Sequence, residues 1–321
     1  MAITNKEQAE FTRLFTAIVE NVEKSLFGKR DVVELVLATM VSEGHILLED
    51  VPGTGKTALA RSIAESIDAK SSRIQFTADL LPSDITGVEV YNQKKEVWEF
   101  NAGPIFANVV LADEINRASP KTQSALLEVM EEGFVTIGKA RQQAGTPFLV
   151  IATQNPIEQA GTNPLPEAQM DRFMIKTKIG YTDTGSTVQI LEGTAEIAKK
   201  LSPVAAAKDI LAMSAIARAV HTNQSVLRYI VDIVEATRQA PQVQFGSSVR
   251  GAKNLAKLAK TWAVAQGRTF ITPDDVKQLA APVLSHRIVL QPEALFDGVE
   301  AGQIIADLLT KVPAPKGDFA N

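Results

Sequence analysis

Apolar residues recur at helical spacing at the start of the chain. The pattern runs through residues 6–42 and is interrupted at Phe27-Gly28. We therefore expect one helix over 6–25 and a second helix over 30–43.

The next part of the chain alternates between short apolar runs and helix-like segments. Five runs are β-branched and almost continuously apolar: 45–49, 72–76, 107–113, 147–153 and 173–179. Helical patterns occupy 56–68 and 120–133, the second with Pro120 near its start and Gly133 at its end. Such strands separated by helices predict an α/β domain with a parallel sheet covered on both faces.

No further strand is expected after Gly180. Apolar residues at helical spacing fill the remainder. The segment 272–280 opens with Thr272 as an expected cap and Pro273 at the first helical position. The predicted layout is an α/β domain over residues 1–180 and a smaller helical domain over 181–321.

Composition narrows the class of protein. The 321 residues are 45% hydrophobic and 22% charged, which is ordinary for a globular chain. The absence of cysteine excludes disulfides and thiolate metal sites. A net charge of −4 gives no overall attraction for nucleic acid, and no apolar stretch approaches the ~20 residues that cross a bilayer. A polar first segment without a signal-peptide core favours a cytoplasmic protein without membrane insertion.

A glycine-rich loop, residues 50–57, joins the first predicted strand to the following helix. Gly53, Gly55, Lys56 and Thr57 fit the phosphate-loop pattern, in which Gly53 occupies a variable position and the other three occupy fixed ones. In such a loop, backbone N–H groups surround anionic oxygens, the lysine reaches the phosphates and the threonine hydroxyl ligates Mg²⁺. A plain glycine-rich turn is the alternative, but the strand before it and the helix after it favour the phosphate site. Asp50 replaces the first glycine of the pattern, so its carboxylate is expected to point away from the phosphates.

Two acids, Asp113 and Glu114, follow the apolar run 107–113. Ligands bind outside the carboxyl ends of parallel strands, so these acids and the phosphate loop should face one crevice. Asp113 would hold Mg²⁺, and Glu114 would orient or deprotonate the attacking water. Acids at strand ends are often only helix caps, and it is the position downstream of the phosphate loop that favours the catalytic interpretation.

Asn155 and Arg172 each have an ordinary and a functional interpretation. Asn155 either belongs to an Asn-Pro turn or lies beside the γ-phosphate and positions water. Arg172 either forms a surface ion pair with Asp171 or Glu167, or reaches the phosphate of a neighbouring subunit.

Arg250 lies in the first turn of a predicted helix that is capped by Ser247 or Ser248. A cation there opposes the helix dipole, and such local conflicts are typical of functional sites. The histidines, by contrast, are widely spaced and lack ligand-type neighbours, so packing or hydrogen bonding is expected of each: His45, His221 and His286.

The chain resembles the MoxR family of AAA+ ATPases from about Phe27 to Ile288. The strings that carry the resemblance are FGKRDVVELVLATMVSEGHILLEDVPGTGKT, ADEINRASPKTQSALLEVMEE, FLVIATQNPIEQAGTNPLPEAQMDRF and SSVRGAKNLAKLAKTWA. The resemblance implies a P-loop AAA+ core with a five-stranded parallel sheet, two hairpin insertions and a small all-α lid.

The resemblance also implies roles for individual residues. ATP or ADP would contact Pro52, Gly53, Thr54, Gly55, Lys56, Thr57 and Ala58, with Leu26, Phe27 and Gly28 along the adenine. Mg²⁺ would be held by Thr57 and Asp113. The catalytic set would be Glu114, Asn155 as sensor 1, Arg172 as arginine finger and Arg250 as sensor 2, which reports the nucleotide state to the helical domain.

The two implied hairpins match residues 84–104 and 133–147. Charged side chains lie at their expected tips: Lys94, Lys95, Lys139 and Arg141. They are either simply solvated turns or the lining of a central pore that grips a client.

At the level of the whole protein, the resemblance implies a homo-oligomer, a hexameric ring with ATP at subunit interfaces. It implies chaperone-like maturation of protein clients, including cofactor or metal insertion, with a partner that carries a von Willebrand factor A domain. The alternative is a nucleic-acid-acting motor or loader, against which stand the acidic charge and the lack of an added DNA-binding module. A third hypothesis is a scaffold that does not hydrolyse ATP.

Overall fold

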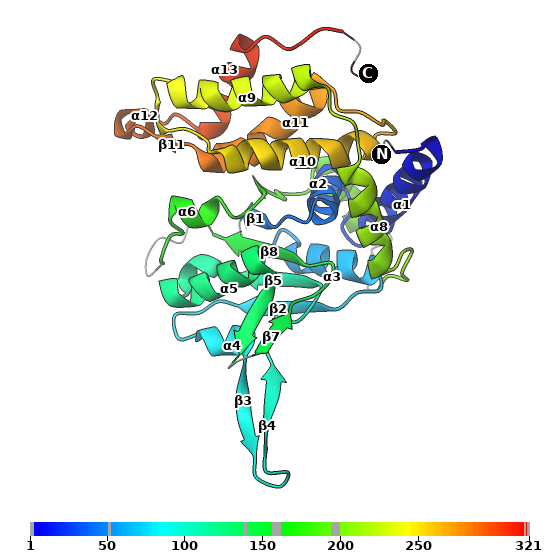
Figure 1. The fold of residues 1–321 in the computed structure, drawn as a ribbon, viewed down its shortest axis with the longest axis vertical. Helices are drawn as coiled ribbons and strands as arrows, with labels where there is room; N and C mark the ends of the chain where they lie inside the picture. Colours follow the sequence, from blue (N-terminus) through cyan, green and yellow to red (C-terminus); the bar gives the residue numbers. More distant parts are fainter. Residues whose placement is uncertain are drawn as a thin grey trace.

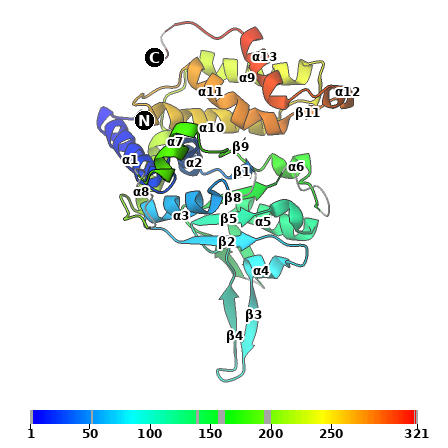
Figure 2. The same cartoon turned by 180° about the vertical axis from the view of Figure 1, so that it is seen from behind.

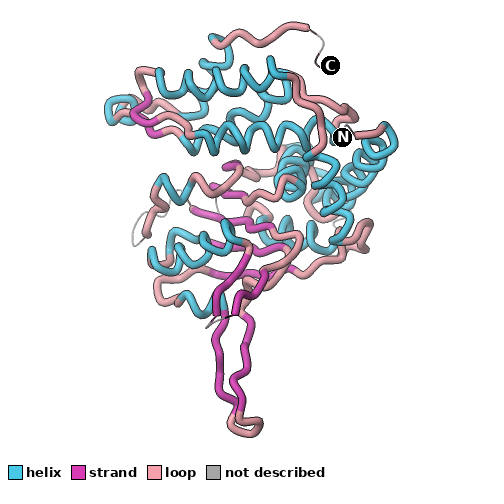
Figure 3. The backbone as a smooth tube through the Cα atoms, viewed as in Figure 1, coloured by secondary structure: helices cyan, strands magenta, loops and turns pink. Residues whose placement is uncertain are grey.

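A parallel sheet enclosed by helices forms the body of the molecule, and a helical lid from the C-terminal part of the chain lies against one end of it (Figure 1). The structure is a computed structural model that describes residues 3–50, 53–137, 140–155, 162–193, 200–317 and 319. A long hairpin projects from the end opposite the lid, as the tube in Figure 3 also shows.

Five parallel strands form the central sheet: β1 (Ile46–Glu49), β2 (Ser71–Gln75), β5 (Val109–Asp113), β8 (Leu149–Gln154) and β9 (Ile175–Thr177). Their order across the sheet is β2-β5-β8-β1-β9. Ile46 of β1 lies opposite Ile151 of β8 and Ile175 of β9. All five predicted strands are present, so the parallel α/β core is confirmed.

Four helices of the core lie near their predicted positions: α1 (Asn5–Glu23), α2 (Arg30–Val41), α3 (Lys56–Ser66) and α5 (Pro120–Glu132). Short helical segments that were not predicted are α4 (Pro82–Thr86), α6 (Glu167–Met170) and a 3-10 turn η1 (Ile115–Arg117). Ser119 caps α5 by accepting the N–H of Thr122. Gly133 ends α5 in a left-handed conformation with φ 72°, as a glycine there predicts.

The two faces of the sheet belong to different hydrophobic cores. Successive strand residues point to opposite faces. Ile46 and Leu48 therefore pack with α1, α2 and α3, whereas Leu47 packs with α4 and α5. This arrangement explains why β5 is buried at every position, and β1 and β8 at every position but the last, rather than at alternate ones.

The lid contains the remaining helices: α7 (Thr184–Leu191), α8 (Ala207–Arg218), α9 (Gln224–Gln239), α10 (Val249–Ala265), α11 (Pro273–Leu284), α12 (Pro292–Phe296) and α13 (Ala301–Lys311), with a 3-10 turn η2 (Ser285–Arg287). Thr272 is the N-cap of α11, as expected, and forms a capping box with Asp275. The apolar residues of the lid continue the core formed by α1 and α2. The boundary at residue 180 stays a prediction, because one core runs through both parts.

One short ribbon departs from the expectation that strands stop after Gly180. In the lid, β10 (Val243–Phe245) pairs antiparallel with β11 (Val289–Leu290). That expectation was wrong here because strands of 3 and 2 residues are too short to show a period of two.

Both predicted hairpins are present. β3 (Gly87–Asn92) pairs with β4 (Val97–Ala102), and β6 (Phe134–Ile137) pairs with β7 (Ala140–Gln143). The proposed turn of the second hairpin, Gly138 and Lys139, lies outside the described residues.

His45 is buried just before β1 and joins two elements through its ring. Its Nδ1 accepts the N–H of Val150 at 3.1 Å, so its Nε2 donates to the carbonyl of Met130 at 3.0 Å. His286 is likewise buried, 3.1 Å from the carbonyl of Phe173. The expected hydrogen-bonding role is confirmed for these two histidines.

Acid is expected to destabilise the fold through His45. Burial lowers the pKa of this group to about 4, so the folded state keeps it neutral below the unfolded value of 6.5. Its contribution is present above pH 6.5 and is lost as the pH falls towards 4, by roughly 3 kcal/mol in total. Denaturant unfolding across this range should show the loss, and a His45→Asn variant should show a shallower pH dependence. An equal slope in both proteins would contradict the assignment.

Candidate functional site

The phosphate loop lies at the carboxyl end of β1 and leads into α3. Gly53 and Gly55 have φ values of 86° and 93°, which residues with a Cβ rarely adopt. Gly55 is the N-cap of α3, so Lys56 and Thr57 open its first turn. Backbone N–H groups at a helix N-terminus favour an anion, and the loop therefore has the local geometry that a phosphate group needs.

Asp50 is turned towards the segment that follows β9. Its Oδ2 accepts the N–H groups of Ile179 and Gly180 at 2.7 and 2.9 Å, and the residue is 5% exposed. The expectation that this carboxylate points away from the phosphates agrees with these bonds. The Lys56 ammonium donates to the carbonyl of Asp50 at 3.3 Å, so it lies close to its own loop.

Thr153, at the end of β8, joins the two acids at the end of β5. Its hydroxyl donates to Asp113 Oδ1 at 2.7 Å and accepts the N–H of Glu114 at 2.9 Å. This contact follows from strand register, since Ala112 lies opposite Ala152. Asn155 is the first residue after β8 and lies at the same edge of the sheet. Sequence reasoning assigned no role to Thr153, because its partners are distant in the chain.

Asp113 also contacts a cation. Arg73 of β2 donates to Asp113 Oδ2 at 2.6 Å. Sequence reasoning missed this arginine, which stands in a half-exposed edge strand with no motif around it. A carboxylate with a threonine hydroxyl in the nearby loop is a donor set suited to Mg²⁺, which takes one or two protein oxygens and completes its shell with water and phosphate.

Glu114 has a strained backbone, with φ 58° and ψ 48°. Left-handed non-glycine residues cost about 1 kcal/mol or more and are concentrated at functional sites. Its Oε2 accepts hydrogen bonds from Gln75 and from Arg117, each at 2.9 Å. The carboxylate is therefore held beside Asp113 by groups from two elements.

The segment before α2 packs against the phosphate loop. A Cβ built on Gly55 would lie 2.8 Å from Leu26 Cδ1, and a Cβ built on Gly28 would lie 2.6 Å from Ser186 Oγ of α7. Leu26 therefore lies against the phosphate loop and Gly28 against α7, with Phe27 between them in the chain; their contact with adenine stays a prediction. Pro52 lies outside the described residues.

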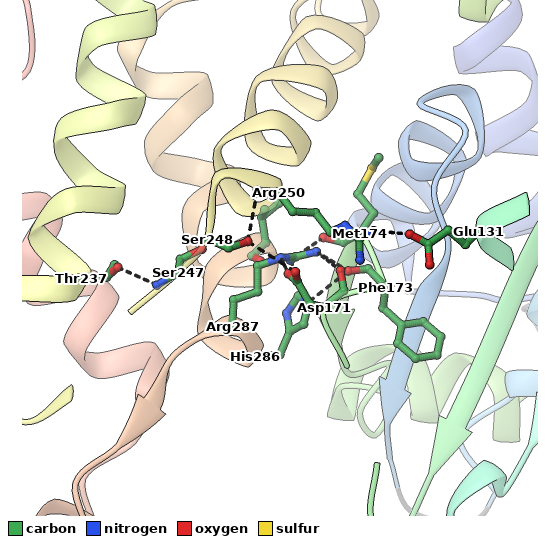
Figure 4. A network of polar contacts seen from close by, with 11 residues as sticks. Glu131, Asp171, Phe173, Met174, Thr237, Ser247, Ser248, Arg250, His286 and Arg287 are labelled. Atoms are coloured by element: carbon green, nitrogen blue, oxygen red, sulfur yellow. Dashed lines mark hydrogen bonds and ion pairs between the residues drawn. The ribbon is translucent and has the colours of Figure 1, made fainter. Parts of the chain in front are cut away.

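Arg172 and Arg250 lie at the opposite edge of the sheet. Arg172 precedes β9, which runs parallel to β1, and Met174 donates its N–H to His45 at the amino end of β1. Both arginines pair with one carboxylate, Glu131 of α5. Arg172 Nε lies 3.1 Å from Glu131 Oε2, and Arg250 contacts Glu131 Oε1 (Figure 4).

The structure thus does not bring these two arginines to the phosphate loop of their own chain. Because β9 runs parallel to β1, the residues before β9 and the loop after β1 lie at opposite ends of the strands. Arg172, which precedes β9, therefore cannot reach the phosphate loop, which follows β1. The ordinary interpretation of Arg172 is also corrected in detail, because its partner is Glu131 and not Asp171 or Glu167. Ser248, one of the two expected caps, accepts the N–H of Arg250.

A buried arginine of the lid, Arg287, holds the segment that presents Arg172. Its side chain is 1% exposed, and its Nε donates to Asp171 Oδ1 at 2.8 Å. Other guanidinium N–H groups reach the carbonyls of Phe173 and Met174 (Figure 4). Burial lowers the pKa of Arg287 to about 10 against the opposing effect of Asp171, so the group stays charged at neutral pH.

The charged residues of the hairpins make contacts within their own hairpin or with the adjoining end of α5. Lys95 pairs with Glu99 at 2.8 Å. Arg141 lies 3.5 Å from Glu132, and its guanidinium carbon lies 4.8 Å from the centre of the Phe134 ring. These contacts fit the solvated-turn interpretation and leave the pore interpretation untested; Lys139 lies outside the described residues.

Two other kinds of site have no counterpart in the part of the chain that the structure describes. No group of three or more histidine, aspartate and glutamate residues there is placed to hold a metal ion. No helix among the described residues combines the length and apolarity that crossing a bilayer requires.

Comparison with known proteins agrees with this geometry. The profile of the ATPase family associated with various cellular activities (AAA) matches residues 45–175, and the profile of the AAA lid domain matches residues 235–308. Chaperone MoxR1 of Mycobacterium tuberculosis is 39% identical over 317 residues, which cover 96% of this chain and 84% of that protein. The chain belongs to the MoxR family of AAA+ ATPases.

Other relatives of this MoxR chain extend the comparison. Protein YeaC of Bacillus subtilis, which is uncharacterized, is 46% identical over 310 residues, 96% of this chain and 97% of that one. The crystal structure of a Cytophaga hutchinsonii protein assigned as an ATPase superposes with a TM-score of 0.90 at 38% identity, over 97% of this chain and 98% of that one. The α/β core and the lid are therefore shared across their full extent.

Replacement of Asp50 tests how the phosphate loop of this MoxR chain is anchored. Asp50→Ala leaves two buried N–H groups without an acceptor and should lower the free energy of unfolding by roughly 2–3 kcal/mol. Asp50→Asn should cost less than about 1 kcal/mol, because both bonds go to one oxygen that the amide retains. Denaturant unfolding measures both variants. Equal losses would show that the negative charge, and not the acceptor geometry, is what matters.

Proposed function

We propose that this MoxR-family chain binds ATP with Mg²⁺ between neighbouring copies, hydrolyses it and uses the cycle to remodel protein clients. The observation that carries the proposal is the division of polar groups between two edges of one sheet. The phosphate loop, Asp113, Glu114 and Asn155 lie at the carboxyl edge, and Arg172 and Arg250 lie at the amino edge.

The triphosphate would lie over residues 53–58, with the adenine against Leu26, Phe27 and Gly28. Lys56 would turn from the carbonyl of Asp50 to the β- and γ-phosphates. Thr57 and Asp113 would hold Mg²⁺, which when bound neutralises charge on the phosphates. To bind Mg²⁺, Asp113 would have to release the Arg73 guanidinium, or use one carboxylate oxygen for the ion and the other for Arg73.

Glu114 would orient the attacking water and take up its proton, with Asn155 beside the γ-phosphate. The carboxylate is already fixed by Gln75 and Arg117, so little reorganisation is needed to aim it. The Thr153 hydroxyl bonds both the Asp113 carboxylate and the backbone N–H of Glu114, which fixes the positions of the two acids relative to each other. Positioning of this kind provides most of the catalysis in phosphoryl transfer.

Arg172 and Arg250 would act on the nucleotide of the next copy. The four residues of β1 separate them from their own loop by roughly 13 Å. Placed side by side on Glu131, they form a ready pair of cations for a neighbour's γ-phosphate. One copy alone lacks these groups at its nucleotide, so the proposal includes a closed homo-oligomer, which we take to be the hexameric ring that the family resemblance implies.

A protein client is favoured over nucleic acid. A relative that is 39% identical is named a chaperone. The β3–β4 hairpin extends from the body and exposes Trp98 and Tyr91, whose rings contact each other across the strands (Figure 1). Exposed aromatic residues on a projecting element suit contact with apolar protein segments. Cofactor or metal insertion into the client, and a partner with a von Willebrand factor A domain, belong to the proposal through the family resemblance.

Glu114→Gln should abolish turnover and leave ATP binding intact. The amide keeps the shape but cannot accept a proton, so a loss of about 100-fold or more in kcat is expected. Phosphate release measures turnover, and a fluorescent ATP analogue measures binding. Turnover close to that of the unchanged protein would refute the assigned role.

Arg172→Ala should reduce turnover by about 100-fold or more, since it removes a cation from the developing charge on the transferred phosphoryl group. Arg172→Ala chains with an intact loop, mixed with Lys56→Ala chains that retain Arg172, should recover part of the activity in the mixed oligomer. Absence of recovery, with mixed oligomers demonstrated, would argue against action across subunits.

A further inference from the structure

Helix α7 has no buried residue and carries apolar side chains on its surface. Val188 is 43% exposed and Leu191 is 81% exposed. Val188 lies beside both Leu191 and Glu192 on the helix surface, because these two residues stand three and four positions after it. Exposed apolar groups gathered on one face commonly mark a contact site.

This helix belongs to the side of the molecule that carries the phosphate loop. Its residue Ser186 approaches Gly28, which precedes α2 next to the loop. Figure 2 shows α7 in front of α2 in the view from behind. From Ser186 to Leu191 the helix rises by about 8 Å.

A groove between α2, α8 and α10, here the α8–α10 groove, has the complementary chemistry. Its volume is about 340 Å³. Apolar groups form its floor and cations form its rim. The floor includes Val41, Ala217 and Ala256, and the rim consists of Arg218, Lys253, Lys257 and Lys260.

The rim has a clear excess of positive charge. Arg218 and Lys257 share one carboxylate, Glu43. Among the described residues no acid forms an ion pair with Lys253 or Lys260. Lys253, Lys257 and Lys260 lie on one face of α10, at spacings of four and three residues. This concentration of cations stands out in a chain whose net charge is −4.

The α8–α10 groove adjoins the Arg172–Arg250 pair. Lys257 lines both the groove and a neighbouring cavity that contains the two arginines. Along α10, Lys257 lies seven residues beyond Arg250, a rise of about 10 Å. α8, one wall of the groove, is labelled in Figure 1, whereas α7 is labelled only in the view from behind in Figure 2.

We propose that α7 of one copy docks in the α8–α10 groove of the next copy, with Val188 and Leu191 on the apolar floor and Glu192 beside Lys253. The inference rests on the proposed function, in which the arginine pair of one copy faces the phosphate loop of the other. Each docking element adjoins a feature that meets across that interface: Ser186 of α7 lies against Gly28, two residues after the Leu26 that touches the phosphate loop, and the groove shares Lys257 with the cavity of the two arginines. This adjacency and the charge complementarity select this occupant. A nucleic-acid backbone would match the rim cations but leave the apolar floor and α7 without partners.

The absence of native cysteine permits a direct test. A chain with Glu192→Cys is mixed with a tagged chain of different size that carries Lys253→Cys, and the mixture is oxidised with magnesium and a non-hydrolysable ATP analogue. A disulfide requires Cα atoms within about 7 Å, so a band containing both chains is expected only if the two positions meet. The matched control replaces Glu192→Cys by Leu227→Cys, an exposed apolar position on α9, and should give at least tenfold less product.

Association measurements test the energetics of the same contact. Leu191→Asp should weaken association by at least about tenfold, because it places a charge where docking would bury an apolar side chain. Glu192→Lys should also weaken association, and Lys253→Glu on the partner chain should restore it. Sedimentation velocity with labelled protein measures all three.

Nucleotide binding, measured in the same samples, distinguishes failure of the docking contact from failure of the proposed function. Multimers that bind nucleotide but give no disulfide above the control would overturn the docking contact and leave the proposed function standing. Binding of single-stranded DNA that is lost in Lys253→Glu, without the disulfide, would also overturn it. Failure to bind nucleotide at all would count against the proposed function and the inference together.

Discussion

The structure depends on one constraint, the parallel alignment of the strands around β1. β1 lies between β8 and β9, so everything that follows these strands gathers at one edge and everything that precedes them gathers at the other. The phosphate loop and the two acids fall at the carboxyl edge, and Arg172 falls at the amino edge. No side-chain movement within one copy can close a gap that the length of the strands sets.

The lid is joined to the amino edge by polar contacts as well as by apolar packing. Arg287 from the lid fixes Asp171 and the carbonyls of Phe173 and Met174, while Arg250 from the lid meets the core at Glu131 (Figure 4). A buried guanidinium with several acceptors resists displacement, because each acceptor left behind would be unpaired. The segment that presents Arg172 should therefore move together with the lid. Such movement would couple the nucleotide state of one copy to the conformation of the next.

Sequence reasoning was most successful where the determining interactions are local. The phosphate loop, the ends of α5 and the start of α11 at Thr272 each depend on residues within a few positions, and each was predicted. Thr153 and Arg73 were missed because their roles arise only when strands distant in the chain become neighbours. The β10–β11 ribbon was missed because its strands are too short for a pattern to show.

By itself, the sequence determined the element types, the parallel α/β class, the family and the identity of the candidate catalytic groups. Apolar period, caps and glycine conformation are properties of short segments and need no knowledge of the fold. Only the tertiary structure decided which groups meet: Thr153 with Asp113, Arg287 with Asp171, and both Arg172 and Arg250 with Glu131. Such contacts depend on the order of the strands and on the position of the lid against the core. Both are set by long-range packing that no local pattern encodes.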